Sequence, residues 1–290
     1  MQKFKYFAPS DVDQALEILS TVKGHKKILA GGTDLVIAIR EGKINPEAII
    51  DLKNTQGLNY IKQENGCIII GAMTTFTDIL ESELVRNNAR VLYESCCSMG
   101  SPQIRNWATI GGNIINASPA TDSVPALMVL DAKVRFKSDL GIRESKVQDI
   151  LKGINKTDLS EKEILTEISF KIPSENTKTG FRKLGRRASL SIARISIACS
   201  LEFEKNTTKC LNAKIALGAV AKNPIRATSA EEILIGKDIS QKLIDDCVEM
   251  ISEIAIKNIG NRPSLPFKQQ SIKGISRELL NRLCDESQFN

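Results

Sequence analysis

The spacing of apolar residues in the first part of the chain alternates between the period of a helix and that of a strand. Val12, Ala15, Leu16 and Leu19 lie three or four positions apart, so residues 11–20 are predicted to form a helix with one apolar face. Short apolar runs bounded by glycine, asparagine or aspartate predict strands. The expected strands are 27–30, 48–52, 60–63, 67–71, 133–136, 142–144 and 168–172, and the expected helices are 11–20, 34–41, 76–82, 86–98 and 124–130.

The pattern changes after residue 191. Two long apolar runs at 195–204 and 212–219 are predicted to be strands that turn at 206–208, and helical periods follow at 229–235, 240–259 and 274–284. A few strands packed against helices make a compact α+β unit. The chain of 290 residues is long enough for two domains with separate cores.

Composition excludes several classes of protein. Hydrophobic residues make up 42% and charged residues 26% of the chain, as in an ordinary globular protein. The net charge is +6, but Lys and Arg are spread along the chain and one Trp and three Tyr offer little base stacking, so we expect no nucleic-acid partner. No apolar stretch reaches membrane-spanning length and the polar start lacks a signal-peptide core, so we expect a cytoplasmic protein with no membrane contact. The densest basic run, 178–187, is interpreted as a charged surface.

The cysteine and histidine content argues against a metal centre in this chain. Seven cysteines stand at irregular spacings without a C-x-x-C pair, which is unlike a disulfide framework or a zinc or iron–sulfur site. His25 is the only histidine, so the sequence excludes the usual catalytic triads and histidine-rich metal sites. We therefore predict no metal ligands.

Two glycine pairs carry the strongest functional signal. Residues 30–35 read Ala-Gly-Gly-Thr-Asp-Leu, and residues 109–113 read Thr-Ile-Gly-Gly-Asn. Glycine allows N–H groups to approach a ligand closely, and Thr, Asp and Asn add polar side chains. Two such loops could hold one pyrophosphate, with the positive end of helix 34–41 facing it; the alternative for each is a tight turn. No G-x-G-x-x-G motif opens a βαβ unit, which excludes a Rossmann site by motif.

These loops and further stretches resemble the FAD-binding subunits of the molybdenum hydroxylases, the family of xanthine and carbon monoxide dehydrogenases. Residues 27–34 are similar to the family's first FAD loop, and residues 100–106 leading into 109–113 are similar to its second. Residues 118–126 resemble the segment whose aspartate binds the flavin nucleotide, and 181–187 resemble the start of the family's C-terminal domain. Matches at 218–221 and 224–227 extend the resemblance over nearly the whole chain.

The resemblance implies a fold and a set of cofactor contacts. The implied fold is α+β: a two-subdomain FAD-binding fold of the vanillyl-alcohol oxidase (PCMH) type in 1–175, divided near 55, then an α+β domain with a three-stranded sheet and helices in 180–286. Asp122 is expected to accept hydrogen bonds from ribose or ribityl hydroxyls, and its alternative role is a helix N-cap. The implied FAD contacts are Lys27, Ile28, Leu29, Ala30, Gly31, Gly32, Thr33, Asp34, Leu35, Thr109, Ile110, Gly111, Gly112, Asn113, Asp122, Leu165 and Lys183.

The resemblance also implies a role as the FAD-binding electron-transfer subunit of a molybdopterin-dependent dehydrogenase or hydroxylase. The implied partners are a large molybdopterin-binding subunit, a small subunit with two [2Fe-2S] clusters, and NAD+ or another electron acceptor. Because the chemistry belongs to the cofactor, no catalytic residue is expected. Two alternatives remain open: a self-contained flavin oxidase or reductase of the same FAD superfamily, and an assembly subunit that has lost its flavin.

Overall fold

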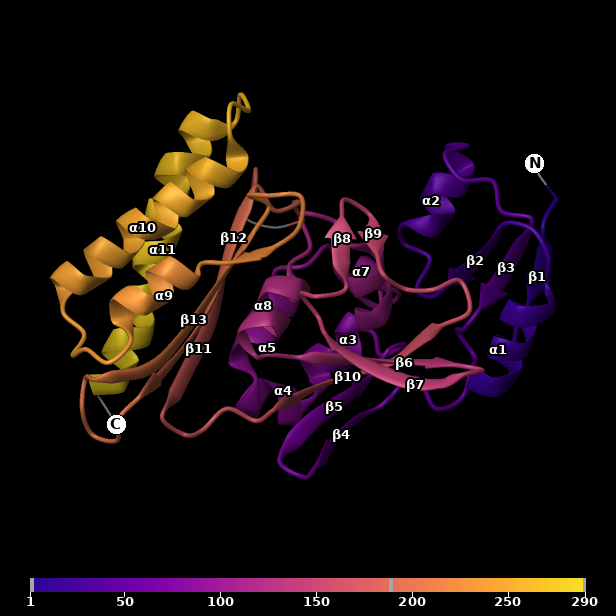
Figure 1. Ribbon diagram of the computed structural model, residues 1–290, viewed down its shortest axis with the longest axis horizontal. Helices are drawn as coiled ribbons and strands as arrows, with labels where there is room; N and C mark the ends of the chain where they lie inside the picture. The colour runs from indigo at the N-terminus through magenta and orange to yellow at the C-terminus, as the bar shows by residue number, and fades with distance from the viewer. Residues whose placement is uncertain (1–2, 188–189, 289–290) are drawn as a thin grey trace.

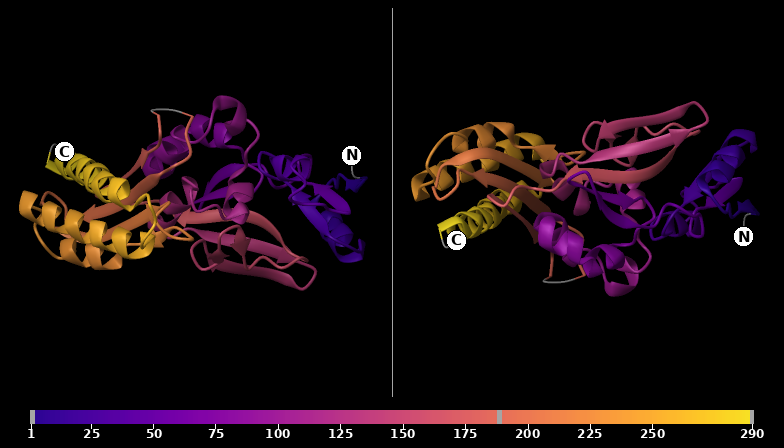
Figure 2. Two further views of the ribbon diagram at one scale, coloured as in Figure 1. Left: turned by 90° about the horizontal axis from the view of Figure 1, so that it is seen from above. Right: turned by 90° about the horizontal axis from the view of Figure 1, so that it is seen from below.

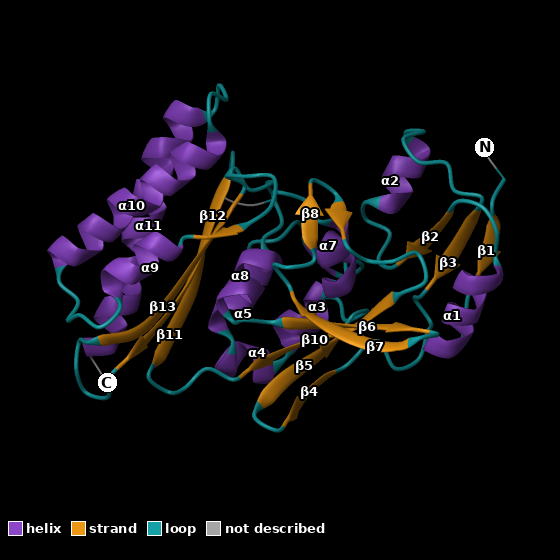
Figure 3. Cartoon of the chain, viewed as in Figure 1, coloured by secondary structure: helices purple, strands orange, loops and turns teal. Residues whose placement is uncertain are grey.

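The computed structural model describes residues 3–187 and 190–288 and has three main sheets in a row along its long axis (Figure 1). A small sheet near the N-terminus lies at one end, a larger sheet lies in the middle, and a third sheet covered by long helices lies at the other end (Figures 2 and 3). The predicted domain ranges also include residues 1–2 and 188–189, which lie outside the described residues. None of the helices in the described ranges has the length and apolar content that a membrane crossing needs.

The N-terminal unit is a parallel sheet of order β1-β3-β2, built from Lys5–Phe7, Ala48–Asp51 and Lys26–Leu29. Helix α1 (Val12–Thr21) packs on this sheet and buries Ala15, Leu16 and Leu19, as the apolar spacing predicts. Helix α2 (Leu35–Arg40) follows β2 and has no buried residue, although most of its residues are aliphatic. This helix therefore leaves apolar surface beside the loop that precedes it.

The central unit is a five-stranded antiparallel sheet of order β4-β5-β10-β6-β7. Its strands are Ile61–Glu64, Cys67–Gly71, Ile164–Lys171, Lys133–Ser138 and Gly141–Lys146 in that order. The turn between β4 and β5 has positive φ at Asn65 and Gly66, which is the tight hairpin that an Asn-Gly pair favours. Six helices lie between β5 and β6 in the chain: α3 (Phe76–Glu81), α4 (Glu83–Asn88), α5 (Arg90–Cys97), α6 (Pro102–Arg105), α7 (Ile110–Asn116) and α8 (Ser123–Val129). Strands β8 (Leu151–Gly153) and β9 (Lys156–Thr157) form a separate hairpin.

The C-terminal unit is an antiparallel sheet of order β11-β12-β13-β14, with strands Thr177–Leu184, Ile195–Phe203, Cys210–Gly218 and Ile225–Arg226. Its helices are α9 (Thr228–Leu234), α10 (Gln241–Ile259) and α11 (Leu265–Gln288), which cover one face (Figure 1). Phe181, Ala198 and Ala216 belong instead to the core of the central unit, where α5 and α8 pack against the other face. The sheet is therefore buried on both sides, and its residues join two cores.

The structure confirms the α+β class and most predicted elements, but it adds β1, α6, α7, β8, β9 and β11, which were not predicted, and it differs in the following further respects. The predicted helix 86–98 is broken at Ala89, whose backbone is not helical, into α4 and α5. The predicted C-terminal sheet of three strands has a fourth, β14, which at two residues is too short to show a period in the sequence. Helix α11 begins at Leu265 rather than 274. The basic run at 178–187 is not simply a charged surface, since most of it forms β11.

Candidate functional site

A cleft of about 700 Å³ lies between the loop after β2 and the first turn of α7. It brings together thirteen of the residues implied by the family resemblance: Lys27, Ile28, Ala30, Gly31, Gly32, Thr33, Asp34, Leu35, Thr109, Gly111, Gly112, Asn113 and Leu165. Leu29, Ile110, Asp122 and Lys183 do not line it. The two glycine pairs, about eighty residues apart in sequence, therefore face one cavity.

The first glycine pair places the loop after β2 in direct contact with the chain before α7. A Cβ at position 31 would lie 1.9 Å from the carbonyl oxygen of Trp107, so only glycine allows this backbone approach. Gly32 has a φ of +74°, a conformation that side chains rarely adopt. Within the described residues, the N–H groups of positions 31–34 have no hydrogen-bond partner. The first loop thus leaves a row of amide donors beside the cleft, as an anion site requires.

The second glycine pair does not form a loop, which corrects the expectation for residues 109–113. Thr109 is the N-cap of α7, and its hydroxyl accepts from the N–H of Gly112 at 3.1 Å. The N–H groups of Ile110 and Gly111 donate to the carbonyls of Thr74 and Ala72, so neither is free for a ligand. A Cβ on Gly111 would lie 2.6 Å from the Ala72 carbonyl oxygen. Gly-Gly serves here for close packing, a use that the sequence does not distinguish from a turn.

Asn113 contributes through its side chain. Its Oδ1 accepts hydrogen bonds from the hydroxyls of Thr121 at 2.5 Å and Ser123 at 2.6 Å. These bonds fix the amide orientation and leave the Nδ2 hydrogens as donors for the cleft that Asn113 lines. Sequence reasoning placed Thr121 and Ser123 in a flavin-related segment but gave no role to their hydroxyls.

Asp122 lies between these two hydroxyl residues and forms a buried ion pair with Lys183. The Lys183 ammonium donates to Asp122 Oδ2 at 2.5 Å and to the Ser98 carbonyl at 2.9 Å. Asp122 makes no capping hydrogen bond to α8, so the alternative role as an N-cap is not observed. Its Oδ1 is buried and has no partner among the described residues. One buried acceptor is thus left without a hydrogen bond, on a residue whose two neighbours bind Asn113 of the cleft.

Burial raises the pKa of the Asp122 carboxyl to about 6, although the charge of Lys183 acts in the opposite direction. A folded-state pKa above the unfolded value means that the group contributes stability at low pH and loses that contribution as the pH rises through 6. We therefore expect the free energy of unfolding, relative to the Asp122→Asn/Lys183→Met double variant, to fall by about 1–2 kcal/mol between pH 5 and pH 8.

Urea unfolding of both flavin-free proteins across this pH range measures the difference. If this difference in the free energy of unfolding stays constant from pH 5 to pH 8, Asp122 of the folded protein is already ionised at pH 5, and folding does not take up the expected proton.

Leu165 reaches the cleft from a bulge in β10, where the pairing with β6 shifts register between Leu165 and Glu167. A bulge re-aims the side chains next to it. The far wall includes Asn116, Asn155 and Leu159, and α2 adds Ile37. Asn155 binds the end of α7, since its side-chain nitrogen donates to the Asn116 carbonyl at 3.1 Å. Sequence reasoning missed these four residues because no motif marks them.

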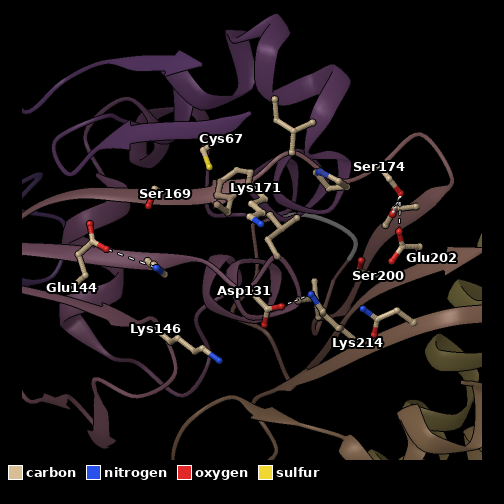
Figure 4. Close-up of a pocket in the computed structure, with 18 residues that line it drawn as sticks. Cys67, Asp131, Glu144, Lys146, Ser169, Lys171, Ser174, Ser200, Glu202 and Lys214 are labelled. Carbon is tan, nitrogen blue, oxygen red and sulfur yellow. Dashed lines mark hydrogen bonds and ion pairs between the residues drawn. The ribbon is translucent and has the colours of Figure 1, made fainter. Parts of the chain in front are cut away.

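A second cleft, of about 540 Å³, lies between the central and C-terminal sheets (Figure 4). Its charged residues include Lys171, Lys214 and Asp131, and Lys214 pairs with Asp131. None of the residues implied for FAD lines it. The candidate site is therefore the cleft beside α7.

Comparison with known proteins now identifies the family. The family profile described as "FAD binding domain in molybdopterin dehydrogenase" matches residues 2–174, and "CO dehydrogenase flavoprotein C-terminal domain" matches residues 180–271. The chain belongs to the FAD-binding subunits of the molybdenum hydroxylase family.

Individual relatives match over nearly their whole length. The nicotinate dehydrogenase FAD-subunit of Eubacterium barkeri is 33% identical over 99% of this chain and 98% of the relative. The glyceraldehyde dehydrogenase medium chain of Sulfolobus acidocaldarius is 30% identical over 97% of this chain and 99% of the relative. A solved carbon monoxide dehydrogenase from Hydrogenophaga pseudoflava superposes with a TM-score of 0.89 at 27% identity, covering 97% of both chains. This FAD-binding subunit therefore has the family's architecture from end to end.

Three features of the site fit FAD, the cofactor of the family. The free amides at positions 31–34 suit the negative charge of a pyrophosphate. A side chain larger than hydrogen at position 112 would extend toward Thr109 and toward Ala30, which line the cleft from the α7 side and from the first loop. The unpartnered Asp122 Oδ1 suits a sugar or ribityl hydroxyl.

Proposed function

We propose that this chain is the electron-transfer subunit of a xanthine dehydrogenase-like molybdenum enzyme. In this role it takes electrons from the [2Fe-2S] clusters of a small partner subunit and passes them to NAD+ or another acceptor, while a large molybdopterin-binding subunit acts on the substrate. The main support is one cleft that combines the free amides of the first loop with the capped turn of α7. End-to-end similarity to FAD subunits and medium chains supports the partners, and a cytoplasmic location remains a prediction.

Each part of the site has a proposed task. The amides of residues 31–34 would bind the pyrophosphate, with the Thr109 and Asn113 side chains on its other side. Asp122 and Lys183 would contact the ribityl chain or the flavin from the end near α8, and Leu165 would pack on the cofactor. The remaining implied contacts that line the cleft, Lys27, Ile28, Ala30, Leu35, Gly111 and Gly112, would shape its walls, whereas Leu29 and Ile110 do not line it.

Bound FAD supplies storage for two electrons and their transfer to an acceptor. The protein itself binds and orients this group, and no side chain of the site is required as a general acid or base. Hydroxylation of a heterocycle or an aldehyde needs a molybdenum centre, which a single histidine and seven scattered cysteines do not provide. The reaction with the organic substrate therefore belongs to the proposed partner.

The division of labour can be tested on the purified chain. With FAD bound it should reduce artificial dyes with NADH, but should not oxidise a purine, nicotinate or an aldehyde. Adding the molybdopterin-binding and [2Fe-2S] chains should restore substrate-dependent reduction of NAD+. Turnover of any such substrate by the single chain would instead favour the alternative, a self-contained flavin oxidase or reductase. A colourless chain that cannot be loaded with FAD would favour an assembly subunit that has lost its flavin.

A further inference from the structure

Strand β11 of the C-terminal sheet lies along helix α5 of the central unit. Because β11 pairs with no described strand except β12, its other edge is open to the helix. Three hydrogen bonds join the two elements: Val91 N to Thr179 Oγ1 at 3.2 Å, Phe181 N to Glu94 Oε2 at 2.8 Å, and Lys183 Nζ to Ser98 O at 2.9 Å. The helix positions are spaced by three and four, and the strand positions by two, so each set lies on one face of its element.

The two outer bonds complete the ends of α5. Ala89 at the N-cap has no side chain that can cap, and the Thr179 hydroxyl accepts a first-turn N–H in its place. At the other end the Lys183 ammonium binds the carbonyl of Ser98, the C-cap residue, where a positive charge is favourable. The strand and the helix therefore fix each other's position along their common length.

Glu94 makes the central bond and is the only carboxylate of the three. Its Oε2 accepts from Phe181 N and from Arg282 of α11, each at 2.8 Å, and its Oε1 accepts from Arg90 at 3.0 Å. Burial acts to raise the pKa of Glu94, but the hydrogen bonds from Arg282 and Phe181 outweigh it and the pKa lies below its ordinary value. The carboxylate is therefore charged at neutral pH.

Arg282 can reach Glu94 because residue 180 is glycine. A Cβ on Gly180 would lie 2.2 Å from Arg282 NH2 and 2.9 Å from Leu279 Cδ1. The guanidinium thus crosses β11 at this glycine and connects α11, β11 and α5 at one carboxylate. Three residues farther along the strand, Lys183 reaches Asp122, whose neighbours bind Asn113 of the cleft.

We propose that Glu94 is a positioning residue for the flavin site, holding β11 in the register that places Lys183 on Asp122. This inference rests on the proposed function, because it assumes that Asp122 and Lys183 serve FAD. Glu94 itself lines neither cleft, and its hydrogen bond to Phe181 N connects it to β11, the strand that carries Lys183.

The test compares FAD dissociation constants of the full chain, after removal of its flavin, for four variants. Glu94→Gln keeps the size but places an uncharged amide against Arg282, and it should weaken FAD binding about tenfold. Lys183→Met should weaken binding at least as much, and the Glu94→Gln/Lys183→Met double variant should be no weaker than Lys183→Met. The matched control is Glu278→Gln, because Glu278 also joins α11 to β11, through Arg182 at 2.7 Å, but does not touch α5. It should stay within twofold of wild type.

The outcomes separate this inference from the proposed function. An additive loss in the double variant would show that Glu94 acts on FAD by a route other than Lys183 and would overturn the inference. An unchanged affinity in Glu94→Gln would overturn it too. If the wild-type chain does not bind FAD at all, the proposed function itself is wrong. Thermal unfolding of each flavin-free variant confirms that it is folded, and the non-additivity is the readout that a purely structural role would not produce.

Discussion

Replacing Gly31 by alanine is expected to weaken FAD binding roughly a hundredfold, about 3 kcal/mol. The new methyl group would lie 1.9 Å from the Trp107 carbonyl oxygen and 2.6 Å from its carbonyl carbon, both backbone atoms that a rotamer change cannot move. No positive φ is involved at this position, so the cost is steric: the first loop must separate from the chain that leads into α7. Titration of the flavin-free chain with FAD measures the effect.

Two other glycines provide graded comparisons. Gly32→Ala should cost about 1–2 kcal/mol, because its φ of +74° is unfavourable but the nearest atoms, at 3.3 Å, belong to the side chains of Leu29 and Val36. Gly274→Ala in α11 meets no atom within 4 Å and should leave FAD affinity unchanged while slightly stabilising the helix. Equal affinity in Gly31→Ala and wild type would show that the contact between the two segments is not needed for the site.

The sequence predicts the first loop well because its requirements are local. A glycine pair between a strand and an apolar helix, followed by Thr33 and Asp34, already specifies a sharp turn with exposed amides. The second pair is different: what makes glycine necessary at position 111 is the carbonyl of Ala72, almost forty residues earlier in the chain. No local pattern contains that contact, so the helix was predicted as a loop.

The part of the site formed by the C-terminal unit shows the same limit. The family resemblance names Asp122 and Lys183 separately, sixty-one positions apart, but their ion pair depends on how β11 lies against α5. Strand β11 itself is hard to recognise, because its basic residues resemble an exposed surface while Thr179, Gly180 and Phe181 are buried. Register between a strand and a helix is set by tertiary packing, which the sequence of either element alone does not determine.

Removing the carboxylate of the buried pair is the second large change. Asp122→Ala leaves the ammonium of Lys183, whose side chain is only 8% exposed, without its counter-charge, and should lower the free energy of unfolding by about 3–5 kcal/mol. Lys183→Met should cost less, since an unpaired Asp122 can take up a proton. The Asp122→Ala/Lys183→Met double variant, which buries neither charge, should recover much of the stability lost in Asp122→Ala.

The three variants should rank differently in FAD affinity than in stability, and a difference between the two rankings would identify a cofactor role for the pair. If the two side chains bind the cofactor, the double variant regains stability but still binds FAD as weakly as the worse single variant. Urea unfolding without flavin and FAD titration of the same three proteins supply both quantities. A double variant that recovers FAD affinity together with stability would mean that the pair only supports the fold, because a methionine and a methyl group cannot replace hydrogen bonds to the flavin or its hydroxyls.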